Sequence, residues 1–308
     1  MKIKSIGFSI TNNNTAVSTK DLLDYLIQKS THEIKRIDYN RQILLTEETN
    51  YYSGLVLTYK NQTKNCLSTI KNGQFSIKVE DILSDDKVVS FNFFCINKTS
   101  LKGLYMYHRG SCSLNNLFSS WQSFSSQLIR KKMTEELKKL PQPRDEIKVK
   151  AIQDKYEGRL SFSVIIDKAG LQTLLQSFNE IKSASFRFDS IDFKDSDMIG
   201  VEQFTRNTEV TFNISDNDKS KVQQIGDNLG KVFNNIAGIS RGVIHAIDHG
   251  KNERVIDLIN SPCFFGEYDF DTIASNVNGL NNANYVGNAI IGMIKEEMEN
   301  GSQRKRFV

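Results

Sequence analysis

The spacing of apolar residues at the start of the chain predicts a strand, a helix and a pair of strands. Residues 3–11 alternate between apolar and polar side chains, which is typical of a half-buried strand. Ser18 is suited to cap a helix in which apolar residues recur at helical spacing as far as Ile27. Residues 34–45 and 51–60 then predict two strands on either side of an acidic turn.

The middle of the chain combines a buried aromatic strand with the longest predicted helix. Residues 88–96 are rich in aromatic and β-branched side chains, and we expect residues 102–108 to pair with them. Between residues 114 and 140, apolar side chains recur every three or four positions, which indicates a helix. Pro141 and Pro143 end this helix, because proline cannot continue the backbone hydrogen bonds, and they form the best candidate linker.

The second half mixes short strands and helices without a regular βαβ rhythm. We expect strands at 160–167, 183–193 and 209–214, helices at 168–182, 215–233 and 282–299, and a hairpin at 242–259. The whole pattern predicts an α+β fold with mixed, mainly antiparallel sheets and packed helices. We expect two lobes, an N-terminal basic domain over residues 1–140 that ends in the long helix and a C-terminal acidic domain over residues 141–308.

Charge is distributed unevenly along the 308 residues. In residues 1–155, 24 Lys and Arg stand against 15 Asp and Glu, a net charge of +9. Residues 156–308 hold 16 basic and 21 acidic residues, a net charge of −5, so the overall +4 hides a basic half joined to an acidic half. Such asymmetry favours a polyanionic partner, and nucleic acid is the usual one.

The basic residues concentrate in residues 129–155, which contain nine Lys and Arg and five Asp and Glu. Neutralising phosphates requires several cations on one surface but no particular motif. Lys148 and Lys150 fall on an expected strand, where alternate residues share one face. Cations at a helix end also complement the helix dipole, which is the competing structural explanation. The candidate DNA contacts in this stretch are Arg130, Lys131, Lys132, Lys138, Lys139, Arg144, Lys148 and Lys150.

The common motifs of nucleotide binding and nucleophilic catalysis do not occur in the sequence. The glycines form no phosphate-binding loop, and no nucleophile elbow or HExxH pair is present. Phe118, Trp121 and Phe124 follow the apolar stripe of the long helix, so we assign them to the core rather than to base stacking. We therefore expect a binding protein that is not an enzyme and that uses no cofactor.

Four pairs of aspartates keep a metal-dependent nuclease open as the alternative function. Carboxylate pairs are able to hold Mg²⁺, but each pair here lies in a turn or at a helix start, where Asp commonly caps backbone groups. The triplets at 33–35 and 146–148 place Glu two residues before Lys, a spacing that arises readily by chance. We expect no metal at these positions, and the pairs are Asp189/Asp192, Asp195/Asp197, Asp216/Asp218 and Asp269/Asp271.

The sequence favours a cytoplasmic location. The four cysteines show no CxxC spacing and are too scattered for a disulfide framework, which indicates reduced thiols. The first residues lack the apolar core and cleavage site of a signal peptide, and every apolar run is too short for a bilayer.

Several segments along the chain resemble the RexA phage-exclusion family, in the order that the family has them. These segments are the opening strand, helix and strand pair at 3–60, the lysine-containing turn at 71–76, the acidic short helix at 79–86, the aromatic residues 91–94, the hairpin at 242–259 and the closing Glu296-Glu297-Met298. The chain departs from the family in its longer basic stretch and in its Arg304-Lys305-Arg306 tail.

This resemblance implies a cytoplasmic, prophage-encoded, DNA-binding homodimer without known catalysis that acts with a membrane partner in abortive infection. It places the family's basic strand-to-helix junction at 212–221, which adds Lys219 and Lys221 to the candidate DNA contacts, although Asp216 and Asp218 interrupt the basic pattern there. We therefore predict sequence-tolerant binding of double-stranded DNA, without a small-molecule substrate. A protein-interaction module whose acidic C-terminal lobe binds a basic partner is the third interpretation.

Overall fold

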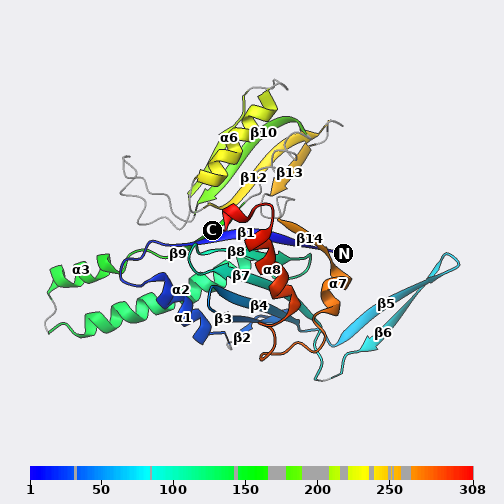
Figure 1. Ribbon diagram of the computed structural model, residues 1–308, viewed down its shortest axis with the longest axis horizontal. Coiled ribbons are helices and arrows are strands. Elements are labelled where there is room, and N and C mark those ends of the chain that lie inside the picture. The colour runs from blue at the N-terminus through cyan, green and yellow to red at the C-terminus, as the bar shows by residue number, and fades with distance from the viewer. Residues whose placement is uncertain are drawn as a thin grey trace.

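The computed structural model forms two antiparallel sheets, helices packed against them and a separate β-hairpin (Figure 1). These elements confirm the α+β class with mainly antiparallel sheets. The structure describes residues 1–30, 33–83, 85–141, 145–165, 178–188, 208–215, 221–235, 239–248, 251, 253–257 and 265–307.

The large sheet has eight strands, in the order β14-β1-β8-β7-β4-β3-β2, and β9 also pairs with β1. Its strands are β1 (Lys2–Asn12), β2 (Glu33–Lys35), β3 (Tyr39–Glu47), β4 (Tyr51–Lys60), β7 (Val89–Asn97), β8 (Lys102–Tyr107), β9 (Leu160–Ile165) and β14 (Gly266–Asp269). The predicted pairing of residues 102–108 with the aromatic strand is confirmed by the β7–β8 ladder. A break at residues 36–38 divides the single strand predicted at 34–45 into β2 and β3.

Two strands from distant parts of the chain share one edge of β1. β14 pairs with the first residues of β1, and β9 pairs with the rest of it, from Gly7 onwards. A side chain at Gly7 would lie 2.4 Å from the ring of Phe265 and 3.0 Å from Ile165, so only glycine fits where the two strands meet. Because β9 and β14 both follow residue 141, the predicted boundary between residues 140 and 141 does not coincide with the division between the sheets.

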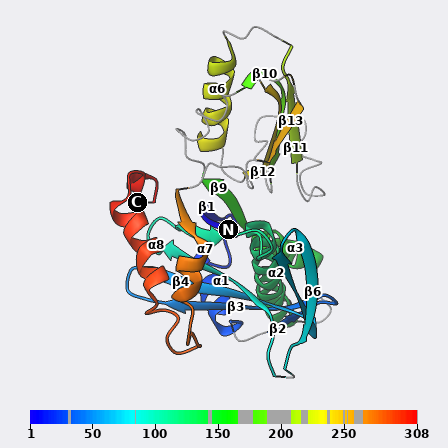
Figure 2. The same cartoon turned by 90° about the vertical axis from the view of Figure 1, so that its right-hand side faces the viewer.

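Helices cover both faces of the large sheet. Helices α1 (Thr19–Gln28) and α2 (Leu114–Lys138) lie on one face, and α7 (Phe270–Ser275) and α8 (Ala289–Asn300) lie on the other (Figures 1 and 2). β7 shows why both faces need a cover. Its alternate residues Phe94 and Ile96 enter the core on the α2 side, whereas Phe93 and Cys95 enter the core on the α8 side. This strand was predicted to be buried, and its residues 90–96 are.

Side-chain caps fix the start of the helices on the α2 side. Ser18 caps α1 in a capping box with Asp21, as predicted. Ser113 caps α2, which ends at Lys138, three residues before Pro141, and so confirms the long predicted helix. On the other face, α8 begins only at Ala289, after its cap Asn288, so the helix predicted from residue 282 starts seven residues later. A short 3₁₀ turn, η2 (Arg304–Arg306), follows α8.

The smaller sheet has the order β11-β10-β12-β13 and packs against one helix. The predicted hairpin at 242–259 is confirmed by the pairing of β12 with β13. The helix predicted at 168–182 is wrong for residues 178–182, which begin β10, and its other residues lie outside the described part. The elements are β10 (Phe178–Phe188), β11 (Thr208–Asn213), α6 (Val222–Asn235), β12 (Ile239–Asp248) and β13 (Glu253–Asp257).

A two-stranded hairpin, which we call the strand arm, extends away from the body between β4 and β7 (Figure 1). It consists of β5 (Lys64–Lys71) and β6 (Gln74–Asp81). Asn72 and Gly73 join the strands with φ angles of 52° and 77°, as a type I′ turn requires. β6 continues to Asp81. The turn predicted at residues 80–83 is therefore wrong for residues 80–81, and the short helix that the family resemblance implied at 79–86 is wrong for residues 79–81.

His108 follows β8, packs against β7 and the start of α7, and gives the fold a dependence on pH. Its ring is buried, contacts the rings of Phe91 and Phe270, and lies 3.2 Å from the carbonyl oxygen of Phe91. Burial lowers the pKa of His108 below its usual 6.5, with a smaller contribution from Lys60. The His108 side chain therefore binds a proton more readily in the unfolded chain than in the folded protein. The contribution of the neutral, buried His108 to stability is fully present above pH 6.5 and falls as the pH drops below this value.

We expect the free energy of unfolding to fall between pH 7 and pH 5 by up to about 1.4 kcal/mol per pH unit. Urea denaturation at several pH values measures this slope. In His108→Gln, which keeps a side-chain donor but cannot titrate, the slope should shrink. An unchanged slope in this variant would assign the pH dependence to other groups.

Candidate nucleic-acid interface

The end of α2 and the following helix α3 (Glu146–Lys155) form a projection that we call the helical arm (Figure 1). Ile129 is the last fully buried residue of α2, and α3 has none. Residues 130–138 and 146–155 therefore extend past the core and expose side chains on most of their surface. The predicted DNA contacts that fall on this arm are Arg130, Lys131, Lys132, Lys138, Lys139, Lys148 and Lys150.

Glu136 holds the two helices of the arm together. Its carboxylate accepts hydrogen bonds from Lys155 Nζ at 2.8 Å and from the hydroxyl of Tyr156 at 2.9 Å. These hydrogen bonds lower the pKa of Glu136 below its usual value, so the carboxylate stays charged near neutral pH. Lys155 is thus neutralised within the arm. No local pattern indicates this contact, because Glu136 and Lys155 are separated by 19 residues and a helix break.

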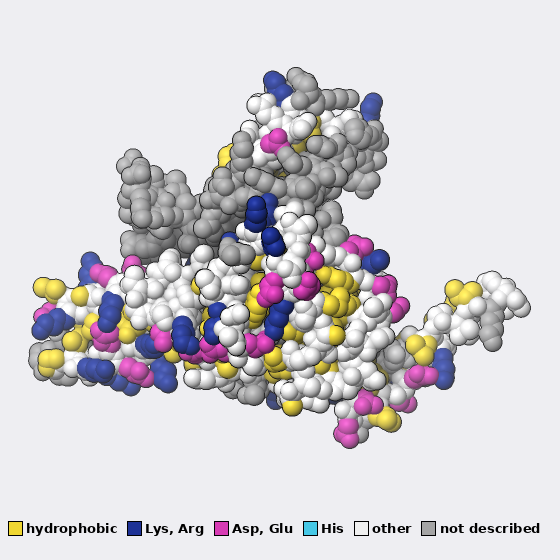
Figure 3. Space-filling view, viewed as in Figure 1, with side chains coloured by type: hydrophobic (Ala, Val, Ile, Leu, Met, Phe, Trp, Pro, Cys, Tyr) yellow, Lys and Arg dark blue, Asp and Glu magenta, His cyan; other side chains and the backbone are white. Residues whose placement is uncertain are grey.

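Three cations of α2 are exposed and form no ion pair with any residue that the structure describes: Arg130, Lys131 and Lys138. Lys131 and Lys138 are seven residues apart, so they lie on the same side of the helix and about 10 Å apart along its axis. Arg130 lies about 80° around the helix from Lys138. Lys139, also exposed, follows as the C-cap of α2. In Figure 3 the basic side chains are visible along this arm, with acidic ones between them.

Lys132, also predicted as a DNA contact, is turned toward the body. Its Nζ lies 3.4 Å from Asp21, the residue that completes the cap of α1. The pKa of Asp21 is lowered mainly by its hydrogen bond with Ser18 and further by Lys132. Lys132 therefore ties α2 to α1, and its positive charge is already partnered.

Lys148 and Lys150 lie on α3 rather than on a strand, so the predicted shared face is wrong. Residues two positions apart in a helix are separated by about 200° around its axis, so the side chains of Lys148 and Lys150 point to opposite sides. Asp145 caps this helix through the backbone amide of Ile147, and Lys148 lies 4.0 Å from the same carboxylate. Lys150 is exposed.

The remaining predicted contacts are not on the described helical arm. Lys221 is exposed and stands one residue before α6, which packs on the smaller sheet. Arg144 and Lys219 lie outside the described residues, as do Asp216 and Asp218. The structure thus gathers part of the predicted set on one projection and places Lys221 beside the smaller sheet.

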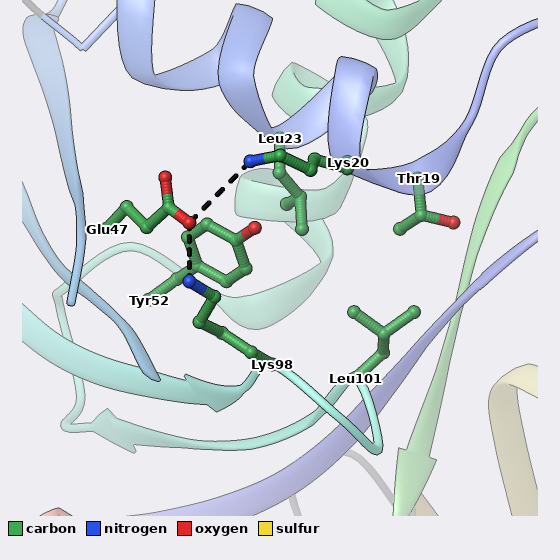
Figure 4. A pocket seen from close by; sticks show the side chains of 7 residues that line it. All are labelled: Thr19, Lys20, Leu23, Glu47, Tyr52, Lys98 and Leu101. Carbon is green, nitrogen blue, oxygen red and sulfur yellow. Dashed lines mark hydrogen bonds and ion pairs between the residues drawn. The ribbon is translucent and has the colours of Figure 1, made fainter. Parts of the chain in front are cut away.

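A pocket of about 310 Å³ lies between the start of α1 and the β7–β8 turn (Figure 4). Glu47 lies between two ammonium groups, forming an ion pair with Lys98 and another with Lys20 at 3.6 Å. Leu101 closes one side with a φ of 56°, a left-handed conformation that is rare for a bulky residue. The remaining lining residues are Thr19, Leu23 and Tyr52.

The charges in this pocket stabilise one another. The hydrogen bond from Lys98 lowers the pKa of Glu47, and Asp24 together with Glu47 raises the pKa of Lys20. Burial raises the pKa of Tyr52. Glu47, Lys20 and Tyr52 are therefore held in their ordinary charge states near neutral pH, whereas a general acid or base needs a pKa close to the working pH. A small anion would have to compete with Glu47 for both lysines.

No group of three or more His, Cys, Asp or Glu side chains that could hold a metal ion converges in the part of the chain that the structure describes. Asp269 caps α7 by accepting hydrogen bonds from the backbone amides of Asp271 and Thr272. The expected capping role is thus confirmed for Asp269, whereas Asp271 lies in the first turn of α7 and donates its backbone amide to that cap. The pairs Asp189/Asp192 and Asp195/Asp197 lie outside the described residues.

Two comparisons with known proteins were negative. No family model matches the chain, and no curated protein matches it. The resemblance to the RexA family therefore stays a prediction. None of the described helices is both long and apolar enough to cross a membrane.

Proposed function

We propose that this protein binds double-stranded DNA through phosphate contacts, with little preference for sequence. The observation that carries the proposal is the projecting helical arm, on which Arg130, Lys131 and Lys138 are exposed and unpaired among the described residues. Cations without a protein partner gain most from a phosphate, because no existing ion pair has to be broken. Counterion release from the duplex would then supply the driving force.

The arrangement supports backbone contacts rather than base readout. Lys and Arg side chains on a phosphate fix the position of a protein on the duplex but carry no sequence information. The exposed cations are spread over about two turns of α2 and continue to Lys139. A row of this length is able to follow several phosphates along one strand of a duplex.

The wider biological role that we propose follows the family resemblance: phage exclusion by a cytoplasmic protein that acts with a second copy of itself and with a membrane protein. Free thiols agree with a reducing compartment, since Cys66, Cys95 and Cys112 form no disulfide. The role in phage exclusion is tested by the survival of infected cells that carry either the intact protein or a variant deficient in DNA binding.

Replacing Arg130, Lys131 and Lys138 together with alanine should weaken DNA binding about equally for every sequence. If about six phosphates are contacted, the intact protein should lose on the order of 10³-fold in affinity between 50 and 200 mM salt. The variant should bind more weakly and show a flatter salt dependence. Mobility-shift titrations with duplex DNA, single-stranded DNA and RNA at two salt concentrations measure both effects.

The matched control removes three lysines that lie outside both arms and already have acidic partners: Lys2, Lys20 and Lys182. It changes the net charge by the same amount, so it separates the helical arm from a general loss of charge. Equal losses in both variants, or no binding by the intact protein at low salt, would contradict the proposal. Both variants should melt at nearly the same temperature, because exposed charges contribute little stability.

A further inference from the structure

The strand arm has one apolar face that no part of the described body covers. Residues directly opposite each other in a hairpin lie on the same face, so Ile70 with Phe75, Ser68 with Ile77, and Cys66 with Val79 form one side. The exposed fractions of Ile70, Phe75, Ile77 and Val79 are 75%, 74%, 63% and 54%. The other side is mostly polar, with Thr69 opposite Ser76 and Asn65 opposite Glu80.

This face contributes nothing to the folding of the body. No residue of β5 or β6 belongs to either hydrophobic core of the described residues. The arm leaves the large sheet where β4 and β7 already pair, at Tyr59 and Val89. An isolated two-stranded hairpin is marginally stable in water, and an apolar face along its whole length favours burial against another surface.

We infer that the apolar face of the strand arm docks on the same face of a second copy of this chain. The face is complementary to itself under a two-fold axis that runs along the arm. Such an axis places each residue over the copy of its own cross-strand partner. Ile77 then packs over the small Ser68 of the other copy, and Phe75 packs over Ile70.

Charge follows the same symmetry at the base of the arm. Lys64 and Asp81 lie opposite each other on the apolar face and form an ion pair at 2.8 Å. The two-fold axis brings each of these charges over the opposite charge of the second copy. A nucleic acid fits this face less well, because Lys64 and Lys78 are already neutralised by Asp81 and Glu80.

The size of the face sets the strength that we expect. Eight residues per strand at about 3.4 Å each, across two strands, give a footprint of roughly 270 Å² per copy. This is below the roughly 800 Å² per partner of a stable interface. Association through the arms alone should therefore be weak and transient, with a dissociation constant of about micromolar or higher.

The inference rests on the second copy named in the proposed function, but not on DNA binding. Sedimentation velocity over a concentration series, without DNA, therefore tests it separately from the DNA contacts. The intact protein should sediment faster as its concentration rises through the micromolar range. Changing Phe75 and Ile77 together to Lys should weaken association at least about 30-fold. The matched control, Thr69 and Ser76 both to Lys, adds the same charge to the polar face of the arm and should associate like the intact protein.

A deletion checks the result without relying on a substituted arm. Replacing residues 61–88 by a two-residue turn between β4 and β7 should give a folded monomer with the melting temperature of the intact body. A monomeric intact protein, or equal association of both lysine variants, would overturn the inference. Unchanged sedimentation combined with weaker DNA retention of the Phe75 and Ile77 variant would also overturn it, and would assign the arm to nucleic acid.

Discussion

Replacing Trp121 with alanine should lower the free energy of unfolding by about 3–5 kcal/mol. Trp121 is 1% exposed and lies at the centre of the core between α2 and the large sheet. Its ring packs edge-on against Phe94 at 5.4 Å between centroids and lies 5.9 Å from the ring of Phe162. Removing it leaves a cavity that touches β7, β9 and α2 together, so no single element is able to close it.

Urea denaturation followed by circular dichroism measures this effect. Trp121 is the only tryptophan in the chain, so its fluorescence cannot report on the variant. Trp121→Phe keeps most of the buried ring and should lose clearly less stability than the alanine variant. A loss below about 1.5 kcal/mol in Trp121→Ala would mean that the core relaxes around the vacated site.

Gly54→Ala should destabilise the protein by about 1–3 kcal/mol although it adds a single methyl group. Gly54 on β4 pairs directly with Phe94 on β7, and the ring of Phe94 lies over the glycine. A Cβ atom at position 54 would stand 1.9 Å from Cζ of Phe94, which is itself fully buried. The ring must therefore move, and Trp121 blocks one of its directions.

The two variants should interact. In the double variant Gly54→Ala, Trp121→Ala, the displaced Phe94 ring is able to enter the space that the indole leaves. We expect the double loss to be smaller than the sum of the single losses by about 1 kcal/mol. Gly292→Ala is the control for a glycine that is free of neighbours, since it lies in α8 with nothing within 4 Å, and it should raise stability by about 0.5–1 kcal/mol. Strict additivity would contradict the proposed movement of Phe94.

Local patterns predicted the elements whose cause lies within a few residues. Ser18 and Asp21 fix the start of α1 by contacts inside one turn, and Pro141 follows the end of α2 closely. The segment that became α3 misled the prediction because residues 146–150 alternate apolar and charged side chains, as a strand does. Asp145 favours a helix in this segment, because its side chain accepts a hydrogen bond from the backbone amide of Ile147 in the first turn.

The strand arm carried a readable signal that the prediction did not use. Asn72-Gly73 between alternating apolar residues is the strongest short-range indication of a hairpin. Its flanking strands hold four exposed apolar side chains on one face, so the pattern alone could not show whether that face is covered. Burial depends on the rest of the chain, and a local pattern contains no information about it.

The candidate site shows the same division. The sequence located the basic helical arm, but it could not separate paired cations from unpaired ones. Lys132 finds its partner Asp21 more than a hundred residues earlier, and Lys155 finds Glu136 on another helix. Arg130 and Lys131 are basic residues directly before Lys132 in the same helix, so the local sequence does not distinguish them from it. They have no such partner among the described residues.

The shared edge of β1 also sets an order in time for the nascent chain. About 250 residues separate Asn12 from Gly266, so at roughly 5–20 residues per second the ribosome needs about 12–50 s to produce β14 after β1. Until then, the first residues of β1 offer open backbone hydrogen-bonding groups along one edge. A slow stretch of translation after β9 would prolong this exposure, and a chaperone that shields strand edges would raise the yield of folded protein.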